Sequence, residues 1–416
     1  MRVLIFEPQY VGHNLSYVNY LAAQLIDLGC DVHLVTSHQA LASEEFKHHL
    51  GHLRPRLKCL PVDGFVTRRK GTGISVNGVL SARTLMHGLQ VGLKSIKPEH
   101  VYVLSGNPLS HWMGLPNPVS RYLRKHRIVS EVVLLFGKYS YPHHGWAASL
   151  KEKLALLALA RGPWQRVHHI LPRAIAAMTS FSRDFAQRAR LLPDPIDPPI
   201  LMSRTEARRM LQLPEQGRYI GLIGVIERRK GIHEFLESFE KALGQLRPDD
   251  RALLAGKSTD EVRHLLASRF QQLTDSGRLI ALDRHLNRQE LWAACNAADV
   301  VTTPYPNHVY SASIVIRAAA AKRFVLANKI GWMDETIGEH SIGATCNTSD
   351  SDTFAAKIVE ALATAEHFTL TESAQRFVHF HSQSNFASHL TELLCQRLHQ
   401  RILDEQVFQE QTRAAC

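Results

Sequence analysis

Cysteines are few in this sequence, and no two of them are close together. The six residues are Cys30, Cys59, Cys295, Cys346, Cys395 and Cys416. Disulfide frameworks and zinc sites need short, regular spacings between cysteines. The sequence therefore argues against both, and the cysteines fit a reducing compartment. We expect a cytoplasmic protein without a bound metal, in which most of the 24 histidines are solvated or hydrogen-bonded.

Long apolar runs are also absent. The longest uninterrupted run after the first strand is Leu154–Ala160, well short of the roughly 20 residues that a membrane-spanning helix requires. The apolar run before Glu7 is too short for a signal peptide and predicts a first strand instead. We expect a protein that is soluble, or peripheral on the inner face of a membrane.

Two common nucleotide-binding signatures are missing. No G-x-G-x-x-G follows the first strand, which argues against dinucleotide binding. Gly256-Lys257-Ser258 resembles the end of a P-loop, but Arg251 stands where that motif needs glycine, which argues against a P-loop NTPase. Asp350-Ser351-Asp352 resembles a metal-binding Asp-x-Asp, but it lies just before a predicted helix, and we interpret it as a cap.

Positive charge is confined to one half of the chain. The formal net charge is +11; residues 1–195 hold 24 Lys and Arg against 11 Asp and Glu, and residues 196–416 hold 25 against 27. The positive electrostatic field of the first half suits an anionic partner, which could be acidic lipid, nucleic acid or a phosphorylated acceptor. The basic runs contain few aromatic residues, so no nucleic acid is expected.

Alternating strands and helices predict an α/β protein with two domains. One parallel sheet begins at Arg2–Phe6 and a second at Tyr219–Val225, and the four prolines of Leu191–Ile200 mark a linker between them. We expect two Rossmann-like domains facing across a cleft, with a last helix near Asn385–Glu405 packing back on the first domain. The predicted boundaries are 1–192, 193–383 and 384–416.

The stretch Val301–Asn328 predicts an anion site. Ala298–Pro304 has the composition of a buried strand, Tyr305–Tyr310 of a loop and Ser311–Lys322 of a helix, with Ser311 or Ser313 as candidate N-cap. Such a βα turn places backbone N–H groups and the positive end of a helix dipole at the carboxyl edge of the sheet. Many parallel α/β proteins have such turns and bind nothing, so a second feature is needed.

That second feature is the turn Arg228-Arg229-Lys230, which precedes another predicted helix. Three cations at a helix N-terminus oppose the helix dipole unless an anion neutralises them. We therefore predict that Arg229 and Lys230 bind phosphate.

Further candidates lie after strands of the first domain, where ligand groups collect in parallel sheets. Gly12 and His13 follow the first strand, although His13 could instead cap the next helix. Lys138, His143 and His144 follow a later strand and are candidates for contact with an acceptor.

Several motifs, in order, resemble the GT-B fold glycosyltransferases, and within them glycosyltransferase family 4 (glycosyl transferases group 1). The resemblance covers nearly the whole chain and rests on the following segments: Leu192–Asp197 as the linker motif, Gly224 through Lys230-Gly231, Leu253–Gly256, Ala298–Val300 with Pro304-Tyr305, and Ser311–Ala327. Each motif is short, but their order and spacing together are specific.

The resemblance implies a retaining, metal-independent transfer of a hexosyl group from a nucleotide-sugar, most often a UDP- or GDP-sugar, to a glycan, lipid or small-molecule acceptor. No other cofactor is implied. The implied catalytic residues are His13, Arg229 and Lys230. The implied donor-binding residues are Gly12, Gly224, Lys230, Lys257, Arg284, His285, Ser311, Ala312, Ser313 and Arg317.

The sequence departs from the family pattern at three positions. Family members usually have two glutamates where this chain has Val309 and Arg317, and an arginine where it has Val225. Arg317 could pair with a phosphate or an acidic donor sugar. The alternative is a catalytically weak or inactive protein that binds sugar nucleotides or glycans, or a partner subunit of an active transferase.

Overall fold

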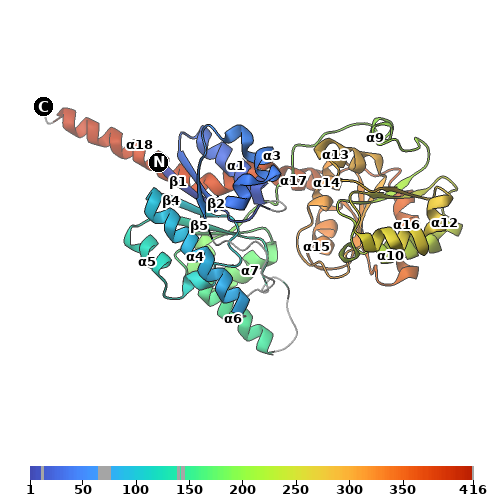
Figure 1. Ribbon diagram of the computed structural model, residues 1–416, viewed down its shortest axis with the longest axis horizontal. Helices are drawn as coiled ribbons and strands as arrows, with labels where there is room; N and C mark the ends of the chain where they lie inside the picture. The colour runs from blue at the N-terminus through green and yellow to red at the C-terminus, as the bar shows by residue number, and fades with distance from the viewer. Residues whose placement is uncertain (11–13, 64–75, 138–140, 142–145, 415–416) are drawn as a thin grey trace. The chain divides into compact units, whose positions relative to one another are not determined.

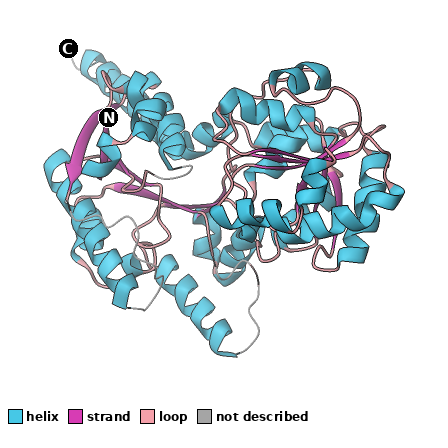
Figure 2. Cartoon of the chain, turned by 45° about the vertical axis from the view of Figure 1, so that its right-hand side comes forward, coloured by secondary structure: helices cyan, strands magenta, loops and turns pink. Residues whose placement is uncertain are grey.

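The computed structural model describes residues 1–10, 14–63, 76–137, 141 and 146–414. The chain divides into two compact units. The first contains Met1–Pro193 together with Gln383–Cys416, and the second contains Asp194–Ser382 (Figures 1 and 2). These limits fall within one residue of the boundaries expected from the sequence.

The first unit is built on a seven-stranded parallel sheet with the order β3-β2-β1-β4-β5-β6-β7. The inner strand β1 pairs with β2 on one side and β4 on the other, so that Val3 lies opposite both Val32 and His100. The strands are β1 (Arg2–Phe6), β2 (Asp31–Ser37), β3 (Lys58–Val62), β4 (His100–Val103), β5 (Val129–Leu134), β6 (Arg166–His169) and β7 (Ala189–Leu191).

Helices connect these strands. They are α1 (Asn14–Asp27), α2 (His38–Ala42), α3 (Glu44–Leu50), α4 (Val76–Ile96), α5 (Pro118–Lys125), α6 (Trp146–Ala160), α7 (Pro172–Phe181) and α8 (Arg183–Arg188). Side chains of α4, α5 and α6, among them Leu89, Leu123 and Leu159, share one buried core with the sheet.

The last helix, α18 (Gln383–Ala414), packs against α1 within the first unit. Phe386 lies against Tyr17 with ring centroids 4.8 Å apart and also contacts Tyr20. This confirms the expectation that the terminal helix returns to the first domain. The helix extends beyond the predicted range at both ends.

A buried charged group joins three neighbouring strands of this sheet. Glu131 on β5 lies 2.7 Å from Nε2 of His100 on β4 and 2.7 Å from Nε2 of His168 on β6. All three residues are almost fully buried. Burial by itself raises the pKa of Glu131, but the hydrogen bonds from the two histidines hold that pKa below its usual value. Hydrogen bonding, rather than solvation, thus accounts for His168, as the sequence led us to expect.

The second unit has a six-stranded parallel sheet with the order β10-β9-β8-β11-β12-β13. Its strands are β8 (Tyr219–Ile223), β9 (Arg251–Ala255), β10 (Leu279–Leu282), β11 (Val300–Thr303), β12 (Phe324–Asn328) and β13 (Gly343–Cys346). Its helices are α9 (Arg204–Met210), α10 (Ile232–Ala242), α11 (Asp260–Ser268), α12 (Gln271–Asp275), α13 (Arg288–Ala297), α14 (Ser313–Ala320), α15 (Gly331–His340), α16 (Ser351–Thr364) and α17 (Glu372–Phe380). Asp350 caps α16, as predicted.

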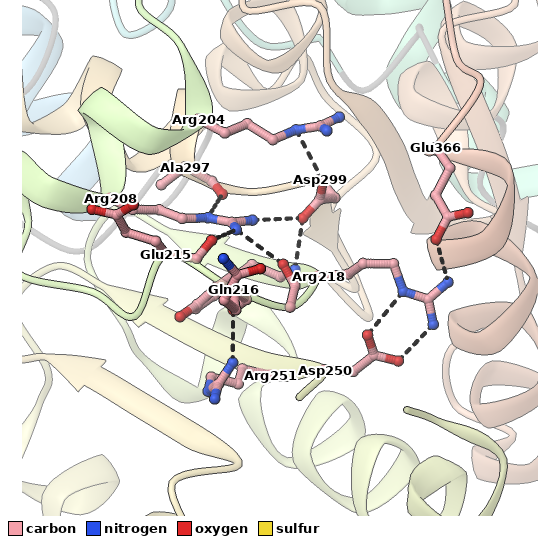
Figure 3. A network of polar contacts seen from close by, with 12 residues as sticks. Arg204, Arg208, Glu215, Gln216, Arg218, Asp250, Arg251, Ala297, Asp299 and Glu366 are labelled. Carbon is pink, nitrogen blue, oxygen red and sulfur yellow. Dashed lines mark hydrogen bonds and ion pairs between the residues drawn. The ribbon is translucent and has the colours of Figure 1, made fainter. Parts of the chain in front are cut away.

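Ion pairs neutralise the amino edge of this second sheet (Figure 3). Asp299, just before β11, accepts hydrogen bonds from the backbone N–H of Tyr219 and from the buried guanidinium of Arg208. Arg218, just before β8, forms two hydrogen bonds with the carboxylate of Asp250, just before β9. These pairs fix the starts of three adjacent strands at the edge opposite the predicted anion site.

No helix in the described residues is long and apolar enough to cross a membrane.

Replacing Asp299 by alanine should destabilise the protein by about 3–5 kcal/mol, because the buried Arg208 guanidinium loses its counter-charge. Urea unfolding followed by circular dichroism would measure the loss. Asp352→Ala is the matched control: its carboxylate pairs with Lys241 but is 84% exposed, so its loss should cost at most about 1 kcal/mol. Equal effects of the two substitutions would contradict the structural role of Asp299.

Candidate functional site

The turns after β8, β9 and β11 meet closely at the carboxyl edge of the second sheet. Gly224 follows β8 with a φ of +97°, and a Cβ placed there would lie 2.8 Å from Nζ of Lys230. Gly231 has a φ of +73°, and its Cβ would lie 2.1 Å from the carbonyl oxygen of Pro304, just after β11. Both positions therefore favour glycine for backbone conformation, and Gly231 also requires it for space because the close atom belongs to the backbone.

Lys230 extends back over this turn. Its Nζ lies 3.3 Å from the carbonyl oxygen of Ile223 and 5.7 Å from the ring centroid of Tyr305. Burial, assisted by the nearby charge of Arg229, lowers the pKa of Lys230 to about 8, against the opposing effect of Glu227. Among the described residues no carboxylate forms an ion pair with this amine. A partly dehydrated cation without a counter-charge is a natural ligand for an anion.

The other two cations of the turn have partners within the chain. Arg228 pairs with Glu261 at 3.2 Å, and Arg229 pairs with Glu227. Both arginines are mostly exposed and belong to a short 3₁₀ turn that precedes α10. Phosphate binding by Arg229 stays a prediction, but glutamates of the chain neutralise two of the three cations, so the argument for an external anion is weaker for those two. Lys230 is the cation of this turn for which that argument still holds.

The loop after β11 leads into α14 without a side-chain cap. The N-cap residue is Ala312, which is buried. The prediction that Ser311 or Ser313 caps the helix was therefore wrong. Ser311 instead donates a hydrogen bond from Oγ to Oδ2 of Asp194, at 2.7 Å. The first-turn N–H groups of α14 are thus not engaged by a capping side chain, which is the condition under which a helix N-terminus binds an anion.

Aromatic side chains line this loop. Tyr305, His308 and Tyr310 form successive edge-to-face contacts, with centroid separations of 5.6 and 6.2 Å. One ring nitrogen of His308 is 3.0 Å from the carbonyl oxygen of Ser311. Burial lowers the pKa of His308 and raises that of Tyr305, so both are neutral near pH 7. They add no charge to the loop that follows β11.

Arg317, which was predicted to take part in donor binding, is engaged by other groups of the chain. Its Nη2 lies 2.8 Å from Oδ2 of Asp197. Its guanidinium also stacks 5.3 Å from the ring centroid of the buried Trp292. The side chain is only 10% exposed. A linker carboxylate and an aromatic ring therefore hold the charge that we expected to face a phosphate or an acidic sugar.

The remaining donor-side candidates lie at the same edge of the sheet. Lys257 and His285 are exposed, following β9 and β10. Arg284 is ion-paired with Glu290 at 2.5 Å. The turn that carries Lys257 is tied to the turn after β8, because Ile226 donates its N–H to the carbonyl oxygen of Lys257. The structure thus brings Gly224, Lys230, Lys257 and the start of α14 to one edge.

Predicted residues Gly12, His13, Lys138, His143 and His144 lie outside the described residues, and their roles stay predictions. One residue close to them in the sequence was missed. Glu7, just after β1, is 1% exposed and accepts hydrogen bonds from Oγ of Ser105 at 2.5 Å and from the N–H of Gln9 at 2.9 Å. Burial raises the pKa of Glu7 to about 8 against the opposing effect of these hydrogen bonds. A glutamate directly after an apolar strand was the signal available in the sequence.

Comparison with known proteins agrees with this geometry. The family model described as "Glycosyl transferases group 1" matches residues 203–378, inside the second unit. The D-inositol 3-phosphate glycosyltransferase of Corynebacterium urealyticum is 27% identical over 193 residues, which are 45% of this chain and 45% of that protein.

Solved structures extend the fold to the whole chain. Anabaena HepE in complex with UDP and glucose superposes with a TM-score of 0.63 at 16% identity, covering 95% of this chain and all of that one. Sucrose-phosphate synthase from Thermosynechococcus elongatus gives a TM-score of 0.66 at 17% identity, covering 97% of this chain and all of that one. At such identities the likeness concerns the fold, which is GT-B.

The matched segment contains every turn described above that converges on Lys230. The matched segment runs from before α9 to within α17. It therefore includes Lys230 and α14, but it excludes Asp194 and Asp197. The linker that holds Ser311 and Arg317 thus lies outside the matched segment.

The buried acid of Glu7 should make stability fall as pH rises. The folded state favours the protonated form of the Glu7 carboxyl group. The favourable contribution of this group to the free energy of unfolding is therefore complete below about pH 4.5 and is lost as the pH approaches 8. Glu7→Gln should remove this dependence and gain on the order of a few kcal/mol over the wild type at pH 9, but little at pH 4. Urea unfolding across this range would test it. A wild-type stability that varied with pH no differently from that of the variant would contradict the assignment.

Proposed function

We propose that this protein is a retaining hexosyltransferase that moves a sugar from a nucleotide-sugar, a UDP- or GDP-sugar, to a glycan, lipid or small-molecule acceptor without a metal. The observation that supports the proposal best is that Lys230 and the uncapped start of α14 lie at the same edge of the second sheet. HepE, which shares the fold, forms complexes with UDP and with UDP-glucose.

The leaving diphosphate of such a donor would bind between two positive groups. The amine of Lys230 would neutralise one charge, and N–H groups of the first turn of α14 would donate to phosphate oxygens. Because Lys230 is already partly buried, much of the desolvation cost is met during folding, and an arriving anion gains a strong interaction. Stabilising the departing diphosphate lowers the barrier to breaking the glycosidic bond. The neutral rings of Tyr305 and His308 would border the nucleotide-sugar.

A second candidate is a catalytically weak or inactive binding protein, or a partner subunit of an active transferase. The observation that favours it is the absence of any carboxylate among residues 305–313 of the donor loop, together with the engagement of Arg317 by Asp197. Such a protein would retain diphosphate binding through Lys230. It would lack the acidic contacts that the family uses on the sugar and ribose.

We also propose that the protein acts in the cytoplasm, at the inner face of a membrane, where a lipid-linked acceptor would be available. The excess positive charge of residues 1–195 supports this placement.

Lys230→Ala should abolish the stabilisation of the protein by UDP or GDP. At a ligand concentration a hundred times its dissociation constant, the wild type should gain about 2.7 kcal/mol. A thermal-shift assay without added metal would measure the gain. Arg228→Ala is the matched control, because it removes a cation of the same turn that pairs with Glu261, and it should keep the shift. No shift with either nucleotide in the wild type would refute the donor site.

Donor binding should weaken as pH rises above about 8. Free Lys230 loses its proton near that pH, while a bound diphosphate favours the charged amine, so binding is strongest below the pKa of the free amine. Calorimetric titration of the identified nucleotide at pH 7, 8 and 9 would show a loss of up to about tenfold per unit above the pKa. An affinity that is constant across this pH range would show that Lys230 does not bind the phosphate.

Turnover distinguishes the two candidates. The identified nucleotide-sugar should be hydrolysed slowly, with release of nucleoside diphosphate, if the chain is an active transferase. Lys230→Ala should then lose both binding and turnover. Retained binding without any nucleotide release, with or without candidate acceptors, would favour the binding protein.

A further inference from the structure

The first turns of α6 carry leucines that the core does not use. Leu156 and Leu159, near the end of the helix, are buried in the core of the first unit. Leu150 and Leu154 are 50% and 53% exposed. Residues four positions apart lie on the same face of a helix, so these two leucines form an apolar stripe that faces water.

A third exposed leucine continues this stripe. Gly114 lies so close to α6 that a Cβ there would be 1.7 Å from the carbonyl oxygen of Ala158, one turn beyond Leu154. The next residue, Leu115, is 50% exposed. Leu115, Leu150 and Leu154 are called the α6 leucine surface below. Of the ten exposed large apolar side chains in the described residues, five lie between residues 80 and 154 of the chain.

Cations surround the α6 leucine surface. Lys151 and Lys153 are exposed on α6 itself. At the other end of the helix, Arg124 of α5 donates a hydrogen bond to the carbonyl oxygen of Arg161, at 2.6 Å. The segments 112–127 and 146–161 together contain seven Lys and Arg against a single acid, Glu152. Part of the charge excess noted in the sequence is therefore gathered around exposed leucines (α5 and α6 in Figure 1).

We propose that the α6 leucine surface and its surrounding cations dock on an anionic lipid bilayer. Leucines would enter the boundary between headgroups and acyl chains, while the lysines beside them would keep their amines among the anionic headgroups. A protein partner fits less well, because protein interface cores are depleted in lysine. The inference stands on these residues alone and does not depend on the proposed transfer reaction.

The contributions of charge and of apolar burial to binding of the bilayer should be separable. Each basic side chain near an anionic leaflet strengthens binding by about fivefold, and this part weakens as salt shortens the screening length. The leucines contribute through burial of apolar surface, which salt does not screen. Docking should therefore require both groups and be reduced, but not abolished, by raised salt.

Vesicle flotation of the full-length protein tests the proposal. The wild type should float with vesicles of phosphatidylglycerol and phosphatidylcholine in equal parts, and not with phosphatidylcholine alone. Leu150→Ser with Leu154→Ser should weaken this binding by about tenfold or more. Lys151→Gln with Lys153→Gln should weaken it by about twentyfold. Because all four side chains are exposed, the melting temperatures should stay unchanged.

The matched control is Leu201→Ser with Met210→Ser, which removes two apolar side chains of the second unit that are 58% and 41% exposed and should leave flotation unaltered. Failure of the wild type to float with anionic vesicles would overturn the proposal. So would wild-type flotation of the double leucine variant, which would mean adsorption by charge alone. Binding to soluble heparin that competes fully with vesicles and is insensitive to the leucine substitutions would identify a polyanion, rather than a bilayer, as the ligand.

Discussion

The candidate site depends on one constraint, the partial burial of the Lys230 amine, which has no carboxylate partner in the part of the chain that the structure describes. Removing an ammonium group from water is costly, and burial has already lowered its pKa to about 8. The surrounding turn is shaped to hold it there. Gly224 leaves room for Nζ, Gly231 allows the turn to close on Pro304, and Tyr305 offers the face of its ring. An anion placed beside this amine would recover the electrostatic energy that folding gave up.

The linker contributes to the same region from outside the matched group 1 segment. Asp194 accepts the hydroxyl of Ser311 just before α14, and Asp197 holds Arg317 one turn further along that helix. His381, near the end of the second unit, is within hydrogen-bonding distance of the backbone of Asp194. The position of α14, and with it the direction of its N-terminal N–H groups, is therefore fixed by two linker carboxylates as well as by the sheet.

The two units differ in how far their charged side chains are balanced by opposite charges. In the second, arginines at the amino edge of the sheet are matched by Asp250 and Asp299, and its net charge is close to neutral. In the first, the buried Glu131 is shared by two histidines, while lysines and arginines accumulate on the exposed helices α5 and α6. A field of this kind cannot assist folding of the first unit, since like charges repel, and it is consistent with an anionic surface as partner.

The amino-acid sequence by itself determined the class of fold. Apolar runs of valine, leucine and isoleucine predicted β1 to the residue and the start of β8, and prolines located the linker, because these signals act over a few neighbouring residues. The sequence also predicted Lys230 as a phosphate ligand, because its position after a strand follows from that local pattern. The short strands β6 and β7 were missed, since their pairing depends on distant neighbours.

Only the tertiary structure decided that Glu227 and Glu261 neutralise two arginines of the turn, that Asp197 engages Arg317, and that Glu7 is buried beside Ser105. Which side chains pair with one another, and which are shielded from water, is set by how the strands and helices pack. Neither can be inferred from the neighbouring residues in the chain.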